Sequence, residues 1–296
     1  MHMKKIFLII LFLVFFNGNA QAREARSITI SPPTINLDLS PGESSSGVLQ
    51  VRNNGTGSLN FNIGIFDYIV NDTKGTPIIL TSPNLSIKFS AASWISTDSE
   101  FFTLTSHTTQ KINYKISVPT NARPGGHYAS VIYKSDSVNS DQTNAKVVAQ
   151  LGTLFYINVK GIIQESAEVI KFEAKKFQEY GPIDLEYRVK NLGDLHIRPK
   201  GSIVIVDTFG HEIERQEIPE HNIFPEASYD YKTTLGEKFM IGRYTVKLVA
   251  NYGENNNRPL MKSVEIIVFP WKIAIITTLV LIIVLLGLYI FKRKST

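Results

Sequence analysis

Apolar and polar residues alternate with a period of two along most of the chain between residues 28 and 268. The alternation is clearest at 59–65 and 112–118, and Gly, Pro and Asn residues interrupt it at short intervals. A period of two predicts β-strands with one buried face, and the interruptions predict turns between them. No segment between the two ends of the chain has a sustained helical period, so we expect an all-β protein body.

The predicted strands fall into two units of sequence, 23–162 and 163–270. In the second unit about seven short strands follow one another, which is the strand count of one immunoglobulin-like β-sandwich. The first unit has the same pattern, with one long insertion at 69–93. The sequence therefore predicts two tandem immunoglobulin-like β-sandwiches.

Two polar loops, 69–93 and 135–144, lie in the first unit. Long polar loops on a rigid β scaffold often carry binding surfaces, and solvated connectors are the equally weighted alternative. A third segment, Pro124, Gly125 and Gly126, predicts a sharp turn, because proline fixes φ and glycine reaches backbone angles closed to other residues. We expect these three residues to shape the fold rather than to contact a ligand.

The first 22 residues have the features of a signal peptide. A positive start is followed by an unbroken apolar run, Ile6–Phe16, and then by an A-x-A site at Ala20 and Ala22. Because a run this short does not span a bilayer, cleavage after Ala22 is favoured over an uncleaved N-terminal anchor. The mature chain would then begin at Arg23.

The other end of the chain is apolar over a longer stretch. As a helix, the uncharged segment 273–291 spans about 28 Å, and Trp271 lies at its outer border. Three basic residues follow it, Lys292, Arg293 and Lys294. Because basic residues stay on the cytoplasmic side, we expect a transmembrane helix at 271–291 and a cytoplasmic tail at 292–296. The β-rich body would lie outside the cell membrane, with the N-terminus outside.

The formal net charge of +5 belongs entirely to these two ends. Lys4 and Lys5 in the leader and the three basic residues of the tail account for it, so the rest of the chain is formally neutral. No electrostatic argument for nucleic-acid binding remains. The chain also has no cysteine, which favours a bacterial or archaeal surface protein over a disulfide-stabilised eukaryotic ectodomain.

The sequence offers little catalytic chemistry. It has no nucleophile elbow, phosphate-binding loop or dinucleotide-binding motif. His211 and Glu212 begin like a zinc-protease helix, but Arg215 stands where the second histidine would be needed. The other histidines of the body have no ligand spacing: His107, His127, His196 and His221. We therefore predict neither an enzyme nor a metal or cofactor site.

Three stretches of the first unit, 31–43, 47–54 and 118–133, carry a resemblance to a known family. They contain a strand followed by Pro-Gly-Glu, a strand ending in Asn-Asn, and a P-x-x-A-x-PGGHY hairpin. In these stretches the chain resembles the WxL-interacting proteins, a family of bacterial surface proteins. The resemblance covers about residues 28–160 and implies that the first unit binds peptidoglycan. The second unit departs from the family's partner-binding domain.

Together these features predict a non-enzymatic, membrane-anchored surface protein that binds cell-wall glycan or another surface protein. A first alternative is a structural stalk or an accessory subunit of an envelope or export assembly, without its own ligand. A second is an enzyme with an unrecognised site. Open sheet edges of sandwiches can also accept a strand from a partner, although the sequence does not identify the edge.

Overall fold

A computed structural model describes residues 27–81, 88–136, 138–139 and 146–294 of the protein. The predicted signal peptide, with Ala20 and Ala22, lies outside the described residues, as does most of the polar loop at 135–144. Apart from a 3-10 turn, η1 (Ala92–Trp94), and one helix, α2 (Trp271–Lys294), the regular elements of the described chain are β-strands. The prediction of an all-β body is confirmed.

The first sandwich is built from two sheets. The four-stranded sheet has the order β1 (Ile28–Ser31), β3 (Ser44–Asn53), β8 (Thr109–Ser117) and β6 (Ile95–Thr97). The six-stranded sheet has the order β2 (Thr34–Leu39), β12 (Gln150–Val159), β9 (Gly125–Ser135), β4 (Leu59–Ile69) and β5 (Ile78–Leu80), and β7 (Phe101–Leu104) also pairs with β4. β10 (Val138–Asn139) and β11 (Lys146–Val147) form a separate small hairpin.

Period-two alternation decides which side chains fill the first core. The predicted apolar faces at 59–65 and 112–118 both face inward, between the two sheets. Phe61, Ile112, Ile116 and Phe155 are almost completely buried there. The alternate residues of the same strands point outward, so the outer face of the six-stranded sheet is free to make other contacts.

The second sandwich pairs a three-stranded with a five-stranded sheet. The first has the order β13 (Ala167–Ala174), β15 (Ile183–Asn191) and β18 (Ser228–Leu235). The second has the order β14 (Phe177–Gln178), β20 (Arg258–Val268), β19 (Gly242–Tyr252), β16 (Lys200–Asp207) and β17 (Glu212–Glu217). It has its own apolar core, separate from the first. The domain limits of 162 and 163 remain predictions.

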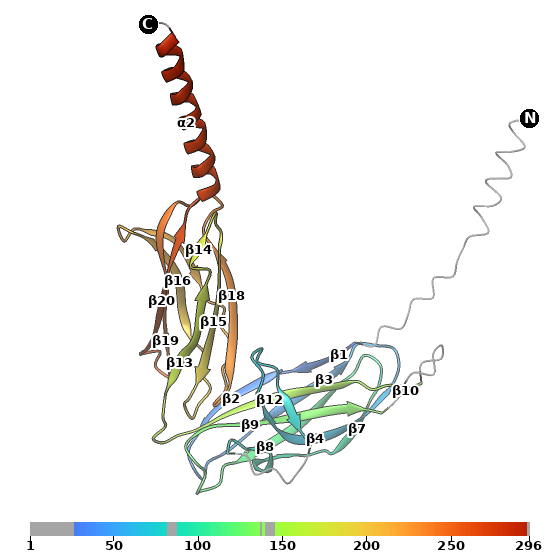
Figure 1. The fold of residues 1–296 in the computed structure, drawn as a ribbon. Helices are drawn as coiled ribbons and strands as arrows, with labels where there is room; N and C mark the ends of the chain where they lie inside the picture. Colours follow the sequence, from blue (N-terminus) through green and yellow to red (C-terminus); the bar gives the residue numbers. More distant parts are fainter. Residues whose placement is uncertain (1–26, 82–87, 137, 140–145, 295–296) are drawn as a thin grey trace, which may run out of the picture.

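The C-terminal helix α2 leaves the end of the second sandwich and makes no buried contact with it (Figure 1). Its apolar window has a mean hydropathy of 3.0, and it is long enough to cross a bilayer by length and composition. The helix continues to Lys294, so the basic residues Lys292 and Arg293 belong to its last turn rather than to a separate tail.

The two sandwiches meet end to face and give the molecule a bent shape (Figure 1). The first sandwich lies across one end of the second, at the end opposite to α2. The six-stranded sheet of the first sandwich is the layer that contacts the second. We call the region where the two sandwiches meet the hinge.

Candidate functional site

An aromatic cluster joins the two sandwiches. From the outer face of the six-stranded sheet come Tyr68, Tyr128 and Tyr156, and the second sandwich contributes Phe224. The ring of Phe224 lies 4.8 Å from Tyr128 and 5.7 Å from Tyr68, centroid to centroid. Aromatic pairs at these separations add to the free energy gained from burial. We call Tyr68, Val70, Tyr128, Tyr156, Phe224 and Ala227 the hinge cluster.

Asp194 of the second sandwich supplies the polar part of this contact. Its carboxylate accepts a hydrogen bond from Arg123 at 2.9 Å and one from the Gln164 N–H at 3.0 Å. Its backbone carbonyl accepts the Gly126 N–H at 2.8 Å. Burial favours a raised pKa for Asp194, but the Gln164 N–H and the Arg123 guanidinium outweigh it and hold the pKa below its usual value. The carboxylate is therefore charged at neutral pH.

His196 lies beside the hinge cluster and is neutral. Its backbone N–H donates to the Tyr128 hydroxyl at 2.9 Å, and its Nδ1 lies 3.3 Å from the same oxygen. Burial, followed by the nearby cation of Arg198, lowers the pKa of His196 to about 4. Burial raises the pKa of Tyr128 well above its usual value. These groups therefore stay uncharged at the hinge at neutral pH.

A sharp turn was predicted at Pro124, Gly125 and Gly126, but Gly125 and Gly126 are the first residues of strand β9, and the chain turns earlier, where the Ala122 N–H donates to the Pro119 carbonyl. Gly125 has a φ of +114°, and a Cβ built on it would lie 2.7 Å from the backbone oxygen of Asp194. A side chain here would meet both an unfavourable backbone angle and the second sandwich. No ligand contact is needed to explain why glycine occupies this position.

The insertion at 69–93 also contacts the second sandwich where it is described. The Asp230 N–H donates to the Thr73 carbonyl at 2.9 Å, and Lys88 lies 3.5 Å from carboxylate oxygens of Asp194 and Glu226. These contacts are made within one chain. The described parts of this loop therefore connect the two sandwiches through a backbone hydrogen bond and ion pairs.

Next to the hinge, the outer face of the six-stranded sheet is mostly apolar. Two rows of paired residues cross β4, β9 and β12 there: Gly64, Ile132 and Gly152, and then Phe66, Ser130 and Leu154. The Phe66 ring lies over Gly64 and the Ile132 side chain over Gly152, in positions that a Cβ would occupy. We call Gly64, Phe66, Ile132, Gly152 and Leu154 the elbow face. A polar row borders it on the side away from the hinge: Asn62, Lys134 and Gln150.

Strand β12, at the side of the elbow face, is paired with a neighbouring strand along only half of its outer side. β2 pairs with it in parallel from Leu154 onward, beginning with a hydrogen bond from the Leu154 N–H to the Pro33 carbonyl at 3.0 Å. Pro32 and Pro33 have no N–H, so the parallel ladder cannot continue backward past them. Among the described residues, no strand pairs with the outer side of Gln150–Thr153.

The direction of the free groups follows from this hydrogen bond. N–H and C=O groups of one residue point to the same side of a strand, and the side alternates from residue to residue. Because Leu154 points its N–H toward β2, Gln150 and Gly152 also point theirs outward. The open half of β12 therefore offers main-chain donors and acceptors to a further strand, beside the apolar elbow face.

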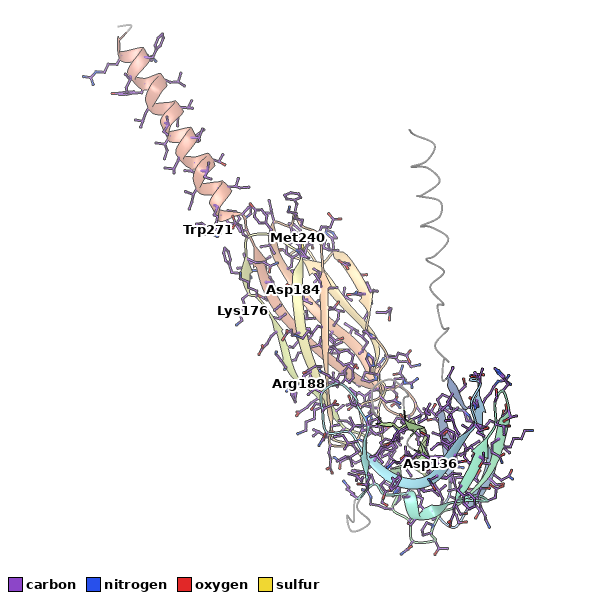
Figure 2. All side chains as sticks on the ribbon, turned by 90° about the vertical axis from the view of Figure 1, so that its right-hand side faces the viewer. Asp136, Lys176, Asp184, Arg188, Met240 and Trp271 are labelled. Carbon is purple, nitrogen blue, oxygen red and sulfur yellow. The ribbon has the colours of Figure 1, made fainter. Side chains whose placement is uncertain are left out.

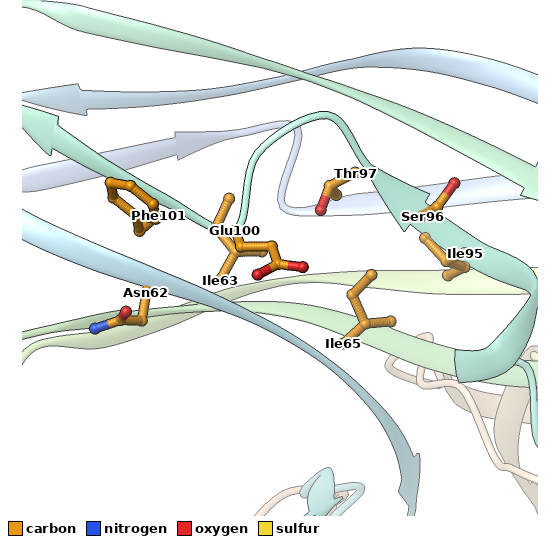
Figure 3. A pocket seen from close by; sticks show the side chains of 8 residues that line it. All are labelled: Asn62, Ile63, Ile65, Ile95, Ser96, Thr97, Glu100 and Phe101. Carbon is orange, nitrogen blue, oxygen red and sulfur yellow. The ribbon is translucent and has the colours of Figure 1, made fainter.

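The opposite edge of the same sheet has a pocket of about 540 Å³ (Figure 3). Its walls come from β4, β6 and the start of β7: Asn62, Ile63, Ile65, Ile95, Ser96, Thr97, Glu100 and Phe101. The edge of β4 is unpaired there only at 63–66, between the segments that pair with β7 and β5. Because the Ile63 N–H already donates to Glu100, this edge has less room for a partner strand than β12.

The histidines named from the sequence do not meet. His127 is buried, with its two ring nitrogens 2.9 Å and 2.8 Å from the carbonyls of Ser90 and Arg123. His211 is exposed and lies 3.0 Å from Asp207 in the turn between β16 and β17. Within the described residues, no three His, Asp or Glu side chains gather as a metal site requires.

No known protein family and no curated protein matches this sequence. Solved structures with a similar arrangement of strands include fimbrial chaperones. The class 5 fimbriae chaperone CfaA has 14% sequence identity and a TM-score of 0.44, over 80% of this chain and 98% of CfaA. The SafB chaperone of Salmonella enterica, in complex with the SafA pilin, has 10% identity and a TM-score of 0.39, over 82% and 99%. CsuC of Acinetobacter baumannii, in complex with a tip subunit, has 9% identity and a TM-score of 0.39, over 81% and 98%.

The expected membership in the WxL-interacting family is wrong, because the similar structures are chaperones of a different family. The shared motifs have local explanations. Gly42 of the Pro-Gly-Glu turn has a φ of +82°, Glu43 accepts the Ser40 N–H at 2.7 Å, and the PGGHY segment forms the hinge. Sandwiches of separate families need the same turns, so these motifs do not identify one family.

The predicted function of a surface protein that binds cell-wall glycan is wrong for the same reason. Peptidoglycan binding and attachment to the cell surface find no support, whereas the chaperone complexes contain protein partners. The prediction that the chain is not an enzyme agrees with the similar structures, which are pilus chaperones.

Proposed function

We propose that the chain is a non-enzymatic accessory protein of an envelope assembly, which holds an exported protein subunit by strand addition to β12. The feature that supports this proposal is the open half of β12 at Gln150–Thr153, beside the apolar elbow face. An edge strand with free main-chain groups binds an extended peptide through backbone hydrogen bonds, and a neighbouring apolar surface accepts its side chains. In the chaperone complexes named above, the partner is likewise another protein subunit.

The remaining parts of the chain have roles that agree with this proposal. The glycines at 64 and 152 leave room for the Phe66 ring and the Ile132 side chain to lie against the sheet, where they form an apolar surface for side chains of the partner. The hinge cluster and Asp194 hold the second sandwich at a fixed angle beside that face. The second sandwich would then set the distance between the bound subunit and α2.

Our proposal also places α2 across the cell membrane, with the sandwiches outside. Its apolar window is as long as a bilayer core is thick, and no part of it is buried against the sandwiches. Lys292 and Arg293 at its end favour a cytoplasmic C-terminus. Such an anchor would keep the accessory protein at the site where exported subunits leave the membrane.

Photo-crosslinking in the producing cells tests the proposal. A photoreactive amino acid replaces Val148, which is 42% exposed just before the open segment. In this background, Gln150→Ala keeps the outward N–H and Gln150→Pro removes it. We expect a discrete adduct with an exported protein. The adduct should form in the Gln150→Ala variant and be lost in the Gln150→Pro variant, and glycan hydrolases should not change its mass.

Two controls make this experiment decisive. The same photoreactive residue at Met261, an exposed position on the second sandwich, should give no adduct. The Gln150→Pro protein should retain the melting temperature of the Gln150→Ala protein, which shows that the fold is intact. Equal adduct yields from the two Gln150 variants would contradict strand addition.

A further inference from the structure

Large apolar side chains gather at the end of the second sandwich from which α2 leaves. Phe209 is 84% exposed, Phe239 78% and Ile241 66%. Single exposed apolar residues are ordinary on protein surfaces, but a group at one end of a domain marks an interaction surface. Phe269 and Trp271, both 43% exposed, connect this group to the start of α2.

Strand register and contacts place these residues at the same end. Asp207, just before Phe209, pairs with Tyr244, and Gly242, just after Ile241, pairs with Val268 near the end of β20. The Phe239 ring lies 6.5 Å from the Tyr180 ring, and Glu179 forms an ion pair of 2.8 Å with Lys272 in α2. Met240 and Trp271 appear at this end of the sandwich in Figure 2.

The local structure holds these side chains outward. Met240 lies between Phe239 and Ile241 and is buried in the core of the second sandwich, so its two neighbours point away from that core. The loop that carries Phe209 is held by Asp207, whose carboxylate accepts the N–H groups of Phe209 and His211 at 2.8 Å each. Hydrogen bonds to Asp207 therefore hold the loop of Phe209, and the buried Met240 side chain holds the loop of Phe239 and Ile241.

We propose that Phe209, Phe239 and Ile241 rest in the interfacial layer of the same bilayer that α2 crosses. The occupant is a lipid surface because the group continues directly into Trp271, where the apolar helix begins. Aromatic side chains favour the headgroup region, where their rings meet apolar chains and their edges meet water. This inference rests on the proposed placement of α2 in the membrane.

Two lysines at this end each lie close to an exposed aromatic ring, as basic residues do at a membrane surface. Lys238 Nζ lies 5.7 Å from the centre of the Phe239 ring, and Lys272 Nζ lies 5.6 Å from that of Trp271. Long basic side chains cover apolar surface with their methylene groups and hold their charge at the headgroup level. Seated in this way, the second sandwich would stand in a fixed orientation on the membrane instead of pivoting about residue 270.

Spin labels on the full chain in lipid nanodiscs test this inference. The chain has no cysteine, so single cysteines at Phe209, Ile241, Asn255 and Leu285 can each carry one label. Oxygen concentrates in the lipid and a nickel chelate stays in water. We expect the labels at 209 and 241 to collide severalfold more with oxygen than with the chelate, and the label at Asn255, in the turn between β19 and β20 at the far end of the sandwich, to show the reverse.

A mutation arm uses the label at 241. Phe239→Asp should raise its exposure to the nickel chelate severalfold, and the matched control Met261→Asp, at an exposed residue on β20 away from the patch, should not. The inference would be overturned if the labels at 209 and 241 were as exposed to the nickel chelate as the label at 255. It would also be overturned if those two labels were shielded from both reagents, because such shielding indicates a contact with protein. The label at Leu285 reports separately whether α2 is in the lipid at all.

Discussion

Asp194 and Gly125 meet where the two sandwiches join, and their contact leaves no room for a side chain at 125. Asp194 also ties this point to Arg123 and Gln164 by charged hydrogen bonds, which are stronger than neutral ones. The angle between the sandwiches therefore depends on a few residues whose effects can be measured one at a time.

Gly125→Ala should destabilise the protein by more than its backbone angle explains. Gly210 offers a matched control, because its φ of +87° is also left-handed but nothing lies within 4 Å of a Cβ there. We expect Gly210→Ala to lower the free energy of unfolding by about 1 kcal/mol, and Gly125→Ala by about 1–3 kcal/mol more. Urea denaturation of both variants measures the difference, and equal losses would show that the hinge contact adds nothing.

The stability of the protein should fall between pH 7 and pH 5 because of His196. Its pKa is about 4 in the fold, whereas the unfolded chain has the ordinary value of about 6.5. The unfolded state then binds more protons in this range, so the stabilisation is complete above pH 6.5 and is lost as the pH falls toward 4. Urea denaturation should show wild type losing about 1–2 kcal/mol more than His196→Phe between pH 7 and pH 5. An identical loss in both proteins would contradict this assignment.

At the scale of elements, half of β12 is open because the chain before Pro32 pairs with β3 in the other sheet, and Pro33 has no N–H to extend the β2 ladder by one more bond. The Pro33 carbonyl already accepts from Leu154, so an N–H at the same residue would point toward the Gly152 carbonyl. The residues that decide this edge therefore lie on the neighbouring strand, more than a hundred positions away in the sequence.

Pro33→Ala should partly close the edge. The new N–H extends the parallel ladder by one bond, and the variant should keep its stability within about 1 kcal/mol of wild type. We expect the yield of the adduct at Val148 to fall, because Gly152 no longer offers a free acceptor. An unchanged yield would show that the partner does not use this part of β12.

The strands could be predicted from the sequence, whereas the contacts of their outer faces and the unpaired edge of the sheet could not. Alternation at 59–65 and 112–118 predicted the buried faces, since burial of one face leaves a direct mark on the sequence. The hinge left no such mark, because Tyr68, Tyr128 and Phe224 are apolar residues on outer faces or in loops. Only the fold shows that they cover one another, and only the strand order shows which edge is free.

The resemblance to a surface-protein family failed for a related reason. Pro124, Gly125 and Gly126 were expected to shape the fold, and the structure places Gly125 and Gly126 in contact with Asp194. A motif that satisfies backbone geometry recurs wherever the same chain path is needed, so it indicates a close approach of the backbone better than it predicts a ligand.

At the scale of the whole molecule, α2, the second sandwich and the first sandwich follow one another along a bent body (Figure 1). In the function that we propose, the second sandwich sets the distance between the membrane and the open edge of β12. The proposed function requires a partner strand to pair with the outer side of β12.

Amide hydrogen exchange tests that claim most directly. The full chain is compared alone and in the complex isolated through the Val148 adduct, using peptides that cover Gln150–Thr153 and Leu154–Val159. We expect exchange at Gln150 and Gly152 to slow at least about tenfold in the complex, because paired strand amides are protected, while exchange in the half already covered by β2 changes little. Unchanged exchange at Gln150 and Gly152 in the complex would contradict this expectation.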